Sequence, residues 1–209
     1  MSDSEHSGSD HPAPEITAVP ERALETGDMA NCLSLLCKTD SGLAHAYVKL
    51  DAKQMKLTNV EALQAYEHLR YVNLSQNFLE NISTLNKLRS LLWLKINQNR
   101  LESARLEKLP YLQVVDFSGN KIRNVLGIEH PHLEQLNLNH NDIPSLEGLE
   151  PKDLPNLISL QLRSNQLSST GAFDVEKLKK LKNSEKIRIF QNYNNKTNHI
   201  QKRAFYIRS

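Results

Sequence analysis

Apolar residues in the central part of the chain recur in a frame of eleven positions. Positions 1, 4, 6 and 11 of this frame are apolar, and position 9 is asparagine. The frame occurs five times, at residues 69–79, 91–101, 112–122, 133–143 and 157–167, with steps of 22, 21, 21 and 24 residues between the asparagines. Several copies in register at such a period are typical of a solenoid, in which each coil buries its apolar face only against neighbouring coils.

The frame also predicts which secondary structure each coil contains. Apolar and polar residues alternate inside it, as at Leu136 and Leu138, and this period of two predicts a short β-strand. The segments between frames carry apolar residues at three-residue steps, for example Ile82, Leu85 and Leu88, which indicates short 3-10 or helical turns. The predicted fold class is therefore α/β: a solenoid with a parallel concave sheet and 3-10 or helical convex segments.

The asparagine at position 9 stands where the chain leaves each strand. Its amide group both donates and accepts hydrogen bonds, so it can satisfy buried backbone groups of neighbouring coils. We therefore predict a structural asparagine ladder that consists of Asn77, Asn99, Asn120, Asn141 and Asn165.

The pattern changes before and after the five frames. Apolar residues between Cys32 and Cys37 predict an N-terminal cap helix over residues 29–45, and a degenerate first coil follows at residues 47–57 with Met55 in the asparagine position. Beyond residue 167 the best continuation, at residues 187–192, lacks several apolar positions. We therefore expect a poorly capped C-terminal end. The repeat domain itself is predicted over residues 46–176.

The 209-residue chain has a net charge of +2 that is unevenly distributed. Residues 1–28 hold seven acidic residues and one basic residue, and we predict a disordered acidic arm there because the segment has little apolar surface to offset its ordering entropy. Residues 177–209 hold ten basic residues and one acidic residue and are predicted to form a basic, divergent tail. Such a tail could bind nucleic acid or an acidic protein surface, or remain solvated. Because no nucleic-acid recognition fold accompanies it, we do not expect a nucleic-acid partner.

Several function classes are not expected. No apolar run of about 18 residues and no secretory signal are recognisable, so we expect a cytoplasmic protein that does not bind a membrane. The two cysteines, Cys32 and Cys37, are expected to fill apolar space. No phosphate-binding loop or catalytic motif is present, so neither an enzyme, a small-molecule substrate nor a cofactor is expected. His130, His132 and Glu134 could be taken for a metal cluster, but a solvated loop is the favoured interpretation.

A binding surface is what the repeat itself predicts. Residues at positions 3 and 5 alternate with the buried leucines and therefore point outward from the concave sheet. Tyr71 and Trp93 occupy position 3 of successive coils, so they are expected to be neighbours and to form a protein-binding hot spot. Alternatively, the N-terminal segment or the cap covers them, or they only stack on each other. The predicted binding residues on this face are Tyr71, Trp93, Lys95, Val114, Asp116 and Asn137.

The five frames resemble the 22-residue class of leucine-rich repeats. At finer grain, residues 33–50, 68–77, 91–101, 109–117, 130–138 and 162–170 resemble a leucine-rich repeat family of radial spoke proteins from motile cilia and sperm flagella. The resemblance implies a location in the cytoplasm and cytoskeleton, at the axoneme of the cilium or flagellum, with axonemal radial spoke proteins as partners. It also implies longer relatives, of which this chain would be a C-terminally truncated or alternatively spliced form.

The principal hypothesis is thus a non-catalytic interaction scaffold of the radial spoke that supports ciliary and sperm motility. Two alternatives remain open at this point. One is a phosphatase-targeting regulatory subunit, because the same repeat class includes one that binds a phosphatase on its concave face. The other is an adaptor in an RNA-containing complex, which would depend on the basic tail.

Overall fold

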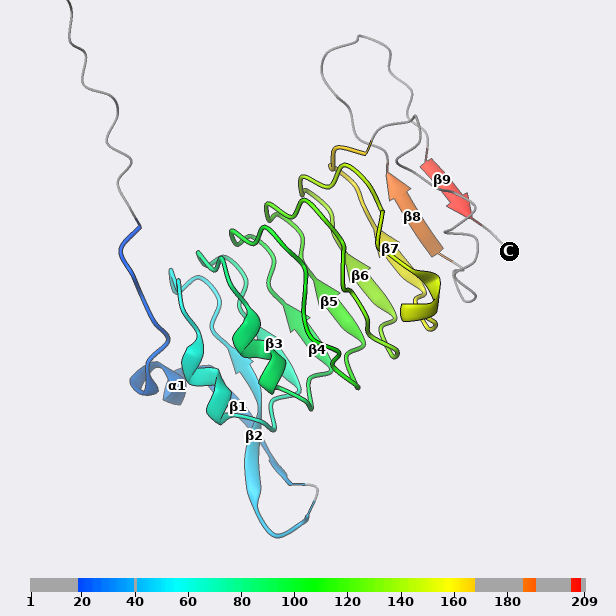
Figure 1. Cartoon of the computed structure of the whole chain (residues 1–209). Coiled ribbons are helices and arrows are strands. Elements are labelled where there is room, and N and C mark those ends of the chain that lie inside the picture. Colours follow the sequence, from blue (N-terminus) through cyan, green and yellow to red (C-terminus); the bar gives the residue numbers. More distant parts are fainter. Residues whose placement is uncertain (1–18, 40, 168–185, 191–203, 208–209) are drawn as a thin grey trace, which may run out of the picture.

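The computed structural model describes residues 19–39, 41–167, 186–190 and 204–207. These residues contain a sheet of nine strands whose order in space follows their order in the chain, so that the coils stack side by side from α1 (Thr26–Cys32) to β9 (Ala204–Ile207) (Figure 1). Strands β2 to β8 are parallel, whereas β1 and β9 pair antiparallel with β2 and β8. The strands are β1 (Leu33–Lys38), β2 (His45–Asp51), β3 (Tyr71–Asn73), β4 (Trp93–Lys95), β5 (Val114–Asp116), β6 (Gln135–Asn137), β7 (Ser159–Gln161), β8 (Lys186–Phe190) and β9 (Ala204–Ile207).

The predicted α/β solenoid is confirmed. Each frame places its positions 3 to 5 in a three-residue strand, and the same positions pair from coil to coil, as Tyr71 does with Trp93. The return segments contain the 3-10 helices η1 (Glu61–Ala65), η2 (Ser83–Lys87) and η3 (Pro151–Asp153). Leu63 of η1 and Leu85 of η2 are fully buried with the strand residues in one continuous core. Burial of such a side chain stabilises the fold by about 1.5–3 kcal/mol.

The asparagines of position 9 join each coil to the preceding one. The Asn99 Oδ1 accepts a hydrogen bond from the backbone N–H of Leu79 at 3.0 Å. Its Nδ2 donates to the carbonyl oxygens of Leu74, in the preceding coil, and Ile96, in its own coil, both at 3.0 Å. Asn77, Asn120, Asn141 and Asn165 make the equivalent contacts.

Position 8, directly before this asparagine, has a left-handed backbone in every frame. The φ angles of these residues lie between 55° and 68°, at Gln76, Gln98, Gly119, His140 and Ser164. Only Gly119 adopts this conformation without steric cost. The turn is therefore imposed by the stacking of coils, and four of its five residues carry no sequence signal for it.

The N-terminal cap differs from the predicted helix over residues 29–45. Helix α1 spans Thr26–Cys32 and ends there, and Leu33–Lys38 continues as strand β1, antiparallel to β2. The prediction was wrong because the apolar residues of this segment were assigned to one helix face, whereas Leu35 and Leu36 are exposed. The free edge of β2 provides a row of backbone hydrogen-bond partners, and pairing with that edge determines the conformation.

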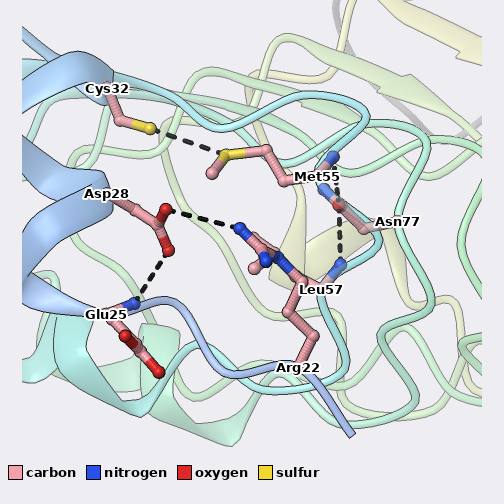
Figure 2. A network of polar contacts seen from close by, with 7 residues as sticks. All are labelled: Arg22, Glu25, Asp28, Cys32, Met55, Leu57 and Asn77. Carbon is pink, nitrogen blue, oxygen red and sulfur yellow. Dashed lines mark hydrogen bonds and ion pairs between the residues drawn. The ribbon is translucent and has the colours of Figure 1, made fainter. Parts of the chain in front are cut away.

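Ordered packing also begins before the predicted boundary at residue 28. Leu24 is buried, and its N–H donates to the Asn59 carbonyl at 2.9 Å. Arg22 pairs with Asp28 at 3.4 Å, and Asp28 also accepts a hydrogen bond from the N–H of Glu25 (Figure 2). Residues 19–28 are thus part of the cap, while the rest of the predicted acidic arm lies outside the described residues.

Met55 shows why the first coil lacks an asparagine. A ladder asparagine bonds to the coil before it, but the element next to this position is α1, whose Cys32 Sγ lies 3.6 Å from the Met55 Sδ (Figure 2). Burial, together with the nearby Asp28 and Asp51 carboxylates, raises the pKa of the Cys32 thiol. Cys32 therefore stays a neutral thiol at this apolar contact, as expected for a space-filling cysteine.

The predicted divergent tail, residues 177–209, contains two strands of the same sheet. Strand β8 pairs parallel with β7, with Leu160 opposite Ile187, and β9 pairs antiparallel with β8. Treating the whole segment as a tail was therefore wrong for these two strands. Strand pairing through the backbone does not require a complete apolar frame, so the missing apolar positions do not prevent β8 from extending the sheet.

Candidate interaction surface on the concave face

The face of strands β2 to β7 that points away from the core, called here the concave face, is formed by two columns of side chains. Register places the predicted residues Tyr71, Trp93 and Val114 side by side in the position-3 column. It also places Lys95, Asp116 and Asn137 side by side in the position-5 column. The degenerate first coil adds Lys49 and Asp51, which pair with Tyr71 and Asn73.

The concave face is hollowed at its N-terminal end. A cavity of about 520 Å³ opens there, and residues of four strands line it, among them Leu35, Lys49, Tyr71, Trp93 and Lys95. Leu35 and Tyr71 keep 56% and 39% of their surface exposed, whereas Trp93 and Lys95 are half-buried. We call this site the aromatic hollow. It joins two predicted aromatic residues with residues of the cap hairpin that the sequence analysis did not select.

Lys95 and Trp93 interact directly inside the hollow. The Lys95 Nζ lies 4.9 Å from the centroid of the Trp93 ring. A cation–π contact of this kind is worth about 0.5–1 kcal/mol at an exposed site. The contact restrains the indole ring of Trp93 and places the positive charge of Lys95 over the face of that ring.

Asp116 and Asn137, two further predicted binding residues, make contacts within the chain. The Asp116 Oδ1 accepts hydrogen bonds from the Ser118 N–H at 3.0 Å and the Ser118 Oγ at 2.6 Å. The Asn137 Oδ1 accepts one from the Asn139 N–H at 3.1 Å. Asn73 bonds Ser75 in the same way. The Asp and Asn side chains at position 5 thus close the turn after the strand, a role that these residue types favour and that the sequence analysis missed.

The two histidines of the loop before β6, His130 and His132, form hydrogen bonds with backbone groups of the preceding coil. His130 is only 2% exposed, and its Nδ1 accepts a hydrogen bond from the Leu109 N–H at 3.3 Å. Burial lowers the pKa of His130 to about 4. The His132 Nδ1 donates to the Pro110 carbonyl at 2.6 Å. Among the residues that the structure describes, no three His, Cys, Asp or Glu side chains lie close enough together to hold a metal ion.

Five lining residues of the hollow were not among the predicted binding residues: Leu35, Lys49, Leu50, Asp51 and Asn73. Lys49 and Asp51 stand at positions 3 and 5 of the degenerate coil, so extending the columns by one coil would have found them. Leu35 had no such signal, because its exposure follows from a left-handed backbone with φ of 59°. Within the described residues, no helix is both long and apolar enough to cross a membrane.

Comparison with known proteins agrees with this geometry. A family model described as "Leucine Rich repeat" matches residues 129–145 and 153–174. These segments hold two coils whose strands pair in the same register as the other coils. The described solenoid has the leucine-rich repeat fold. Two solved leucine-rich repeat structures share this fold. An internalin C2 from Listeria monocytogenes has a TM-score of 0.53 at 21% identity, over 64% of this chain and 62% of its own. The leucine-rich repeat domain of APL1B has a TM-score of 0.52 at 22% identity, over 64% of this chain and 42% of its own.

The leucine-rich repeat chain is also homologous to leucine-rich repeat-containing protein 23 of several vertebrates. The human protein is 52% identical over 135 residues, which make up 65% of this chain and 39% of the relative. The mouse protein is 46% identical over 147 residues, 70% of this chain and 42% of the relative. The chain thus spans about two fifths of the length of these relatives.

Proposed function

We propose that this leucine-rich repeat chain is a non-catalytic protein–protein interaction scaffold that binds its partner on the concave face. The observation that carries the proposal is the aromatic hollow. Tyr71 and Leu35 remain exposed on a rigid sheet, next to the Lys95–Trp93 pair. Large apolar side chains held in fixed positions provide contact area at low entropic cost, which is how binding hot spots work.

We further propose that the partners are axonemal radial spoke proteins, and that the chain acts in the cytoskeleton of motile cilia and sperm flagella. The homology to leucine-rich repeat-containing protein 23 supports this proposal. The cap and repeat segments are those whose sequence resembles a radial spoke family. The leucine-rich repeat domain itself accounts for the binding surface, while the ciliary location depends on the resemblance alone.

The experiment uses the full chain, tagged and expressed in multiciliated cells. We expect it to localise to the axoneme and to co-purify with radial spoke proteins. Trp93→Ala should reduce the co-purified amount at least tenfold, while Ser159→Ala, in the same column three coils further on, should leave it unchanged. Co-purification of a phosphatase in place of spoke proteins, or capture that nuclease treatment abolishes, would replace this proposal with one of the two alternatives.

A further inference from the structure

We infer that the aromatic hollow is a docking site for an extended acidic segment of a partner protein. The segment inserts one aliphatic or aromatic side chain between Leu35 and Trp93. Its carboxylates pair with Lys49 and Lys95. This inference deepens the proposed function, on which it rests, because it states the chemistry that the concave face recognises.

The apolar part of the recognition comes from side chains that the fold leaves uncovered. Leu35 on β1, Tyr71 on β3 and Trp93 on β4 surround the cavity from three strands. Exposed apolar groups that converge on a concavity are typical of sites that receive a partner side chain. The volume of about 520 Å³ admits one large side chain with part of its backbone, and not a folded domain.

Leu35 supplies an independent observation. In the β1–β2 register, Ser34 lies opposite Lys49 and Leu36 opposite Tyr47, so Leu35 falls opposite the buried Val48. Regular alternation would direct Leu35 to the core side of the hairpin. Its φ of 59° instead brings it to the wall of the hollow. A leucine in this conformation costs about 1–2 kcal/mol. Unlike the left-handed residues at position 8, Leu35 lies on a strand and lines the hollow.

The charge of the hollow selects an acidic ligand. Neither Lys49 nor Lys95 forms an ion pair with another described residue. The carboxylate of Asp51, the acidic residue of the lining, accepts a hydrogen bond from the Asn73 Nδ2 at 3.0 Å. Two positive charges and one negative charge therefore face the cavity. Such an imbalance attracts carboxylates and sets specificity more than affinity.

The positions of the two lysines predict the spacing of the acidic residues. Lys49 lies on β2 at position 3 and Lys95 on β4 at position 5, so they are two strands and two residues apart. Strand spacing of about 4.8 Å and a rise of about 3.3 Å per residue put their Cα atoms about 12 Å apart. An extended peptide covers that distance in three to four residues. The expected motif is two acidic residues three or four positions apart, with an apolar residue between them.

A second copy of the chain is a poor occupant. In a symmetric dimer formed through the same patch, Lys49 and Lys95 would face the same two lysines of the other copy. Like charges brought together at an interface are destabilising. The charge pattern therefore favours a different, acidic partner segment.

The test is selection of a random twelve-residue peptide library, displayed on phage, against the immobilised full chain. We expect enrichment of acidic peptides with an internal aromatic or aliphatic residue. A fluorescein-labelled synthetic copy of the dominant peptide should lose at least tenfold in affinity to Trp93→Ala and to Lys49→Glu. It should bind the Ser159→Ala control like the unchanged chain.

Leu35→Gly separates binding from folding. Glycine accepts the φ of 59° without strain, so the melting temperature should not fall, but the apolar wall is lost and peptide affinity should fall several-fold. Enrichment of basic peptides, or affinity that Trp93→Ala and Leu35→Gly leave unchanged, would overturn the inference. So would a dimer that Trp93→Ala dissociates, or enrichment seen only after deletion of residues 1–18, since another copy or the chain's own segment would then be the occupant. If the peptide test fails while co-purification of spoke proteins persists and still depends on Trp93, the proposed function stands and only the acidic ligand is excluded.

Discussion

The N-terminal half of the concave face (β2 to β4) and its C-terminal half (β6 and β7) have the same backbone arrangement but expose different side chains. Strands β2 to β4 present Lys49, Tyr71 and Trp93 in the position-3 column, whereas β6 and β7 present Gln135 and Ser159. Both halves have the same strand register, and Asn99 and Asn141 make equivalent ladder contacts in them. Positions 1, 4, 6, 9 and 11 of the frame therefore determine the fold, and positions 3 and 5 are left to vary. The candidate binding surface lies where the varying positions become aromatic and cationic.

The largest expected effect is on stability, and it tests whether the asparagine ladder stabilises both halves to the same extent. Asn99→Ala leaves the Leu79 N–H without its buried partner. The Leu74 and Ile96 carbonyls each lose one of two hydrogen bonds, because they also accept from Asn77 and Asn120. At about 1–3 kcal/mol for the unsatisfied N–H and about 0.5–1.5 kcal/mol for each lost hydrogen bond, the free energy of unfolding should fall by roughly 2–6 kcal/mol. Asn141→Ala, in the polar half, should cost a similar amount. Urea denaturation measures both.

Asn97→Ala is the matched control, because Asn97 stands two residues from Asn99 and its side chain is not part of the ladder. It should change stability by less than about 0.5 kcal/mol. A large loss for Asn97→Ala, or a small one for either ladder variant, would contradict the account of the ladder.

The second effect is a pH dependence that originates between the two halves, in the coil that leads to β6. Burial holds the pKa of His130 at about 4, below the usual 6.5, so the folded protein binds fewer protons than the unfolded chain between these values. Stability contributed by neutral His130 is complete above about pH 6.5 and is lost as pH falls toward 4. The expected loss is about 3 kcal/mol.

Stability curves between pH 4 and 7 measure this effect, and they need a variant to assign it. His130→Gln should flatten the curve in this window, because glutamine does not titrate. His132→Gln, which changes the exposed histidine of the same loop, should leave the curve as it is. An unchanged slope in His130→Gln would show that other groups cause the acid sensitivity.

The smallest effect lies within the aromatic hollow. Lys95→Met removes the cation 4.9 Å from the Trp93 centroid and should cost less than about 1 kcal/mol of stability. Because Trp93 is the chain's only tryptophan, its fluorescence reports on the hollow directly. The emission should change with Lys95→Met and stay constant with Gln161→Met, at the same position in β7. Identical spectra for Lys95→Met and the unchanged chain would contradict the contact.

Sequence reasoning was sufficient where the repeat constrains the chain. The strands, their register and the neighbourhood of Tyr71 and Trp93 follow from positions that recur five times. It was not sufficient where a residue's conformation depends on a single tertiary partner. Leu33–Lys38 has apolar residues that fit a helix as well as a strand, and only the free edge of β2 decides between them.

The same limit applies to the candidate site. Tyr71, Trp93 and Lys95 could be selected from alternation alone, whereas Leu35 depends on a backbone angle that its residue type disfavours. Asp116 and Asn137 were predicted as binding residues, but their side-chain oxygens accept hydrogen bonds from N–H groups two residues further along the chain. Asp116 and Ser118 have the spacing of a known turn signal, which the alternation of apolar and polar residues does not reveal.

The most direct test of the central claim is hydroxyl-radical footprinting of the full chain with and without radial spoke particles isolated from axonemes. The account predicts that Tyr71 and Trp93 are protected in the complex. Tyr111, which is 58% exposed and lies outside the hollow, and Ile158, next to β7, should react equally in both samples. Protection of Tyr111 or Ile158 with Tyr71 and Trp93 left reactive would show that the chain binds through another surface and would contradict the account.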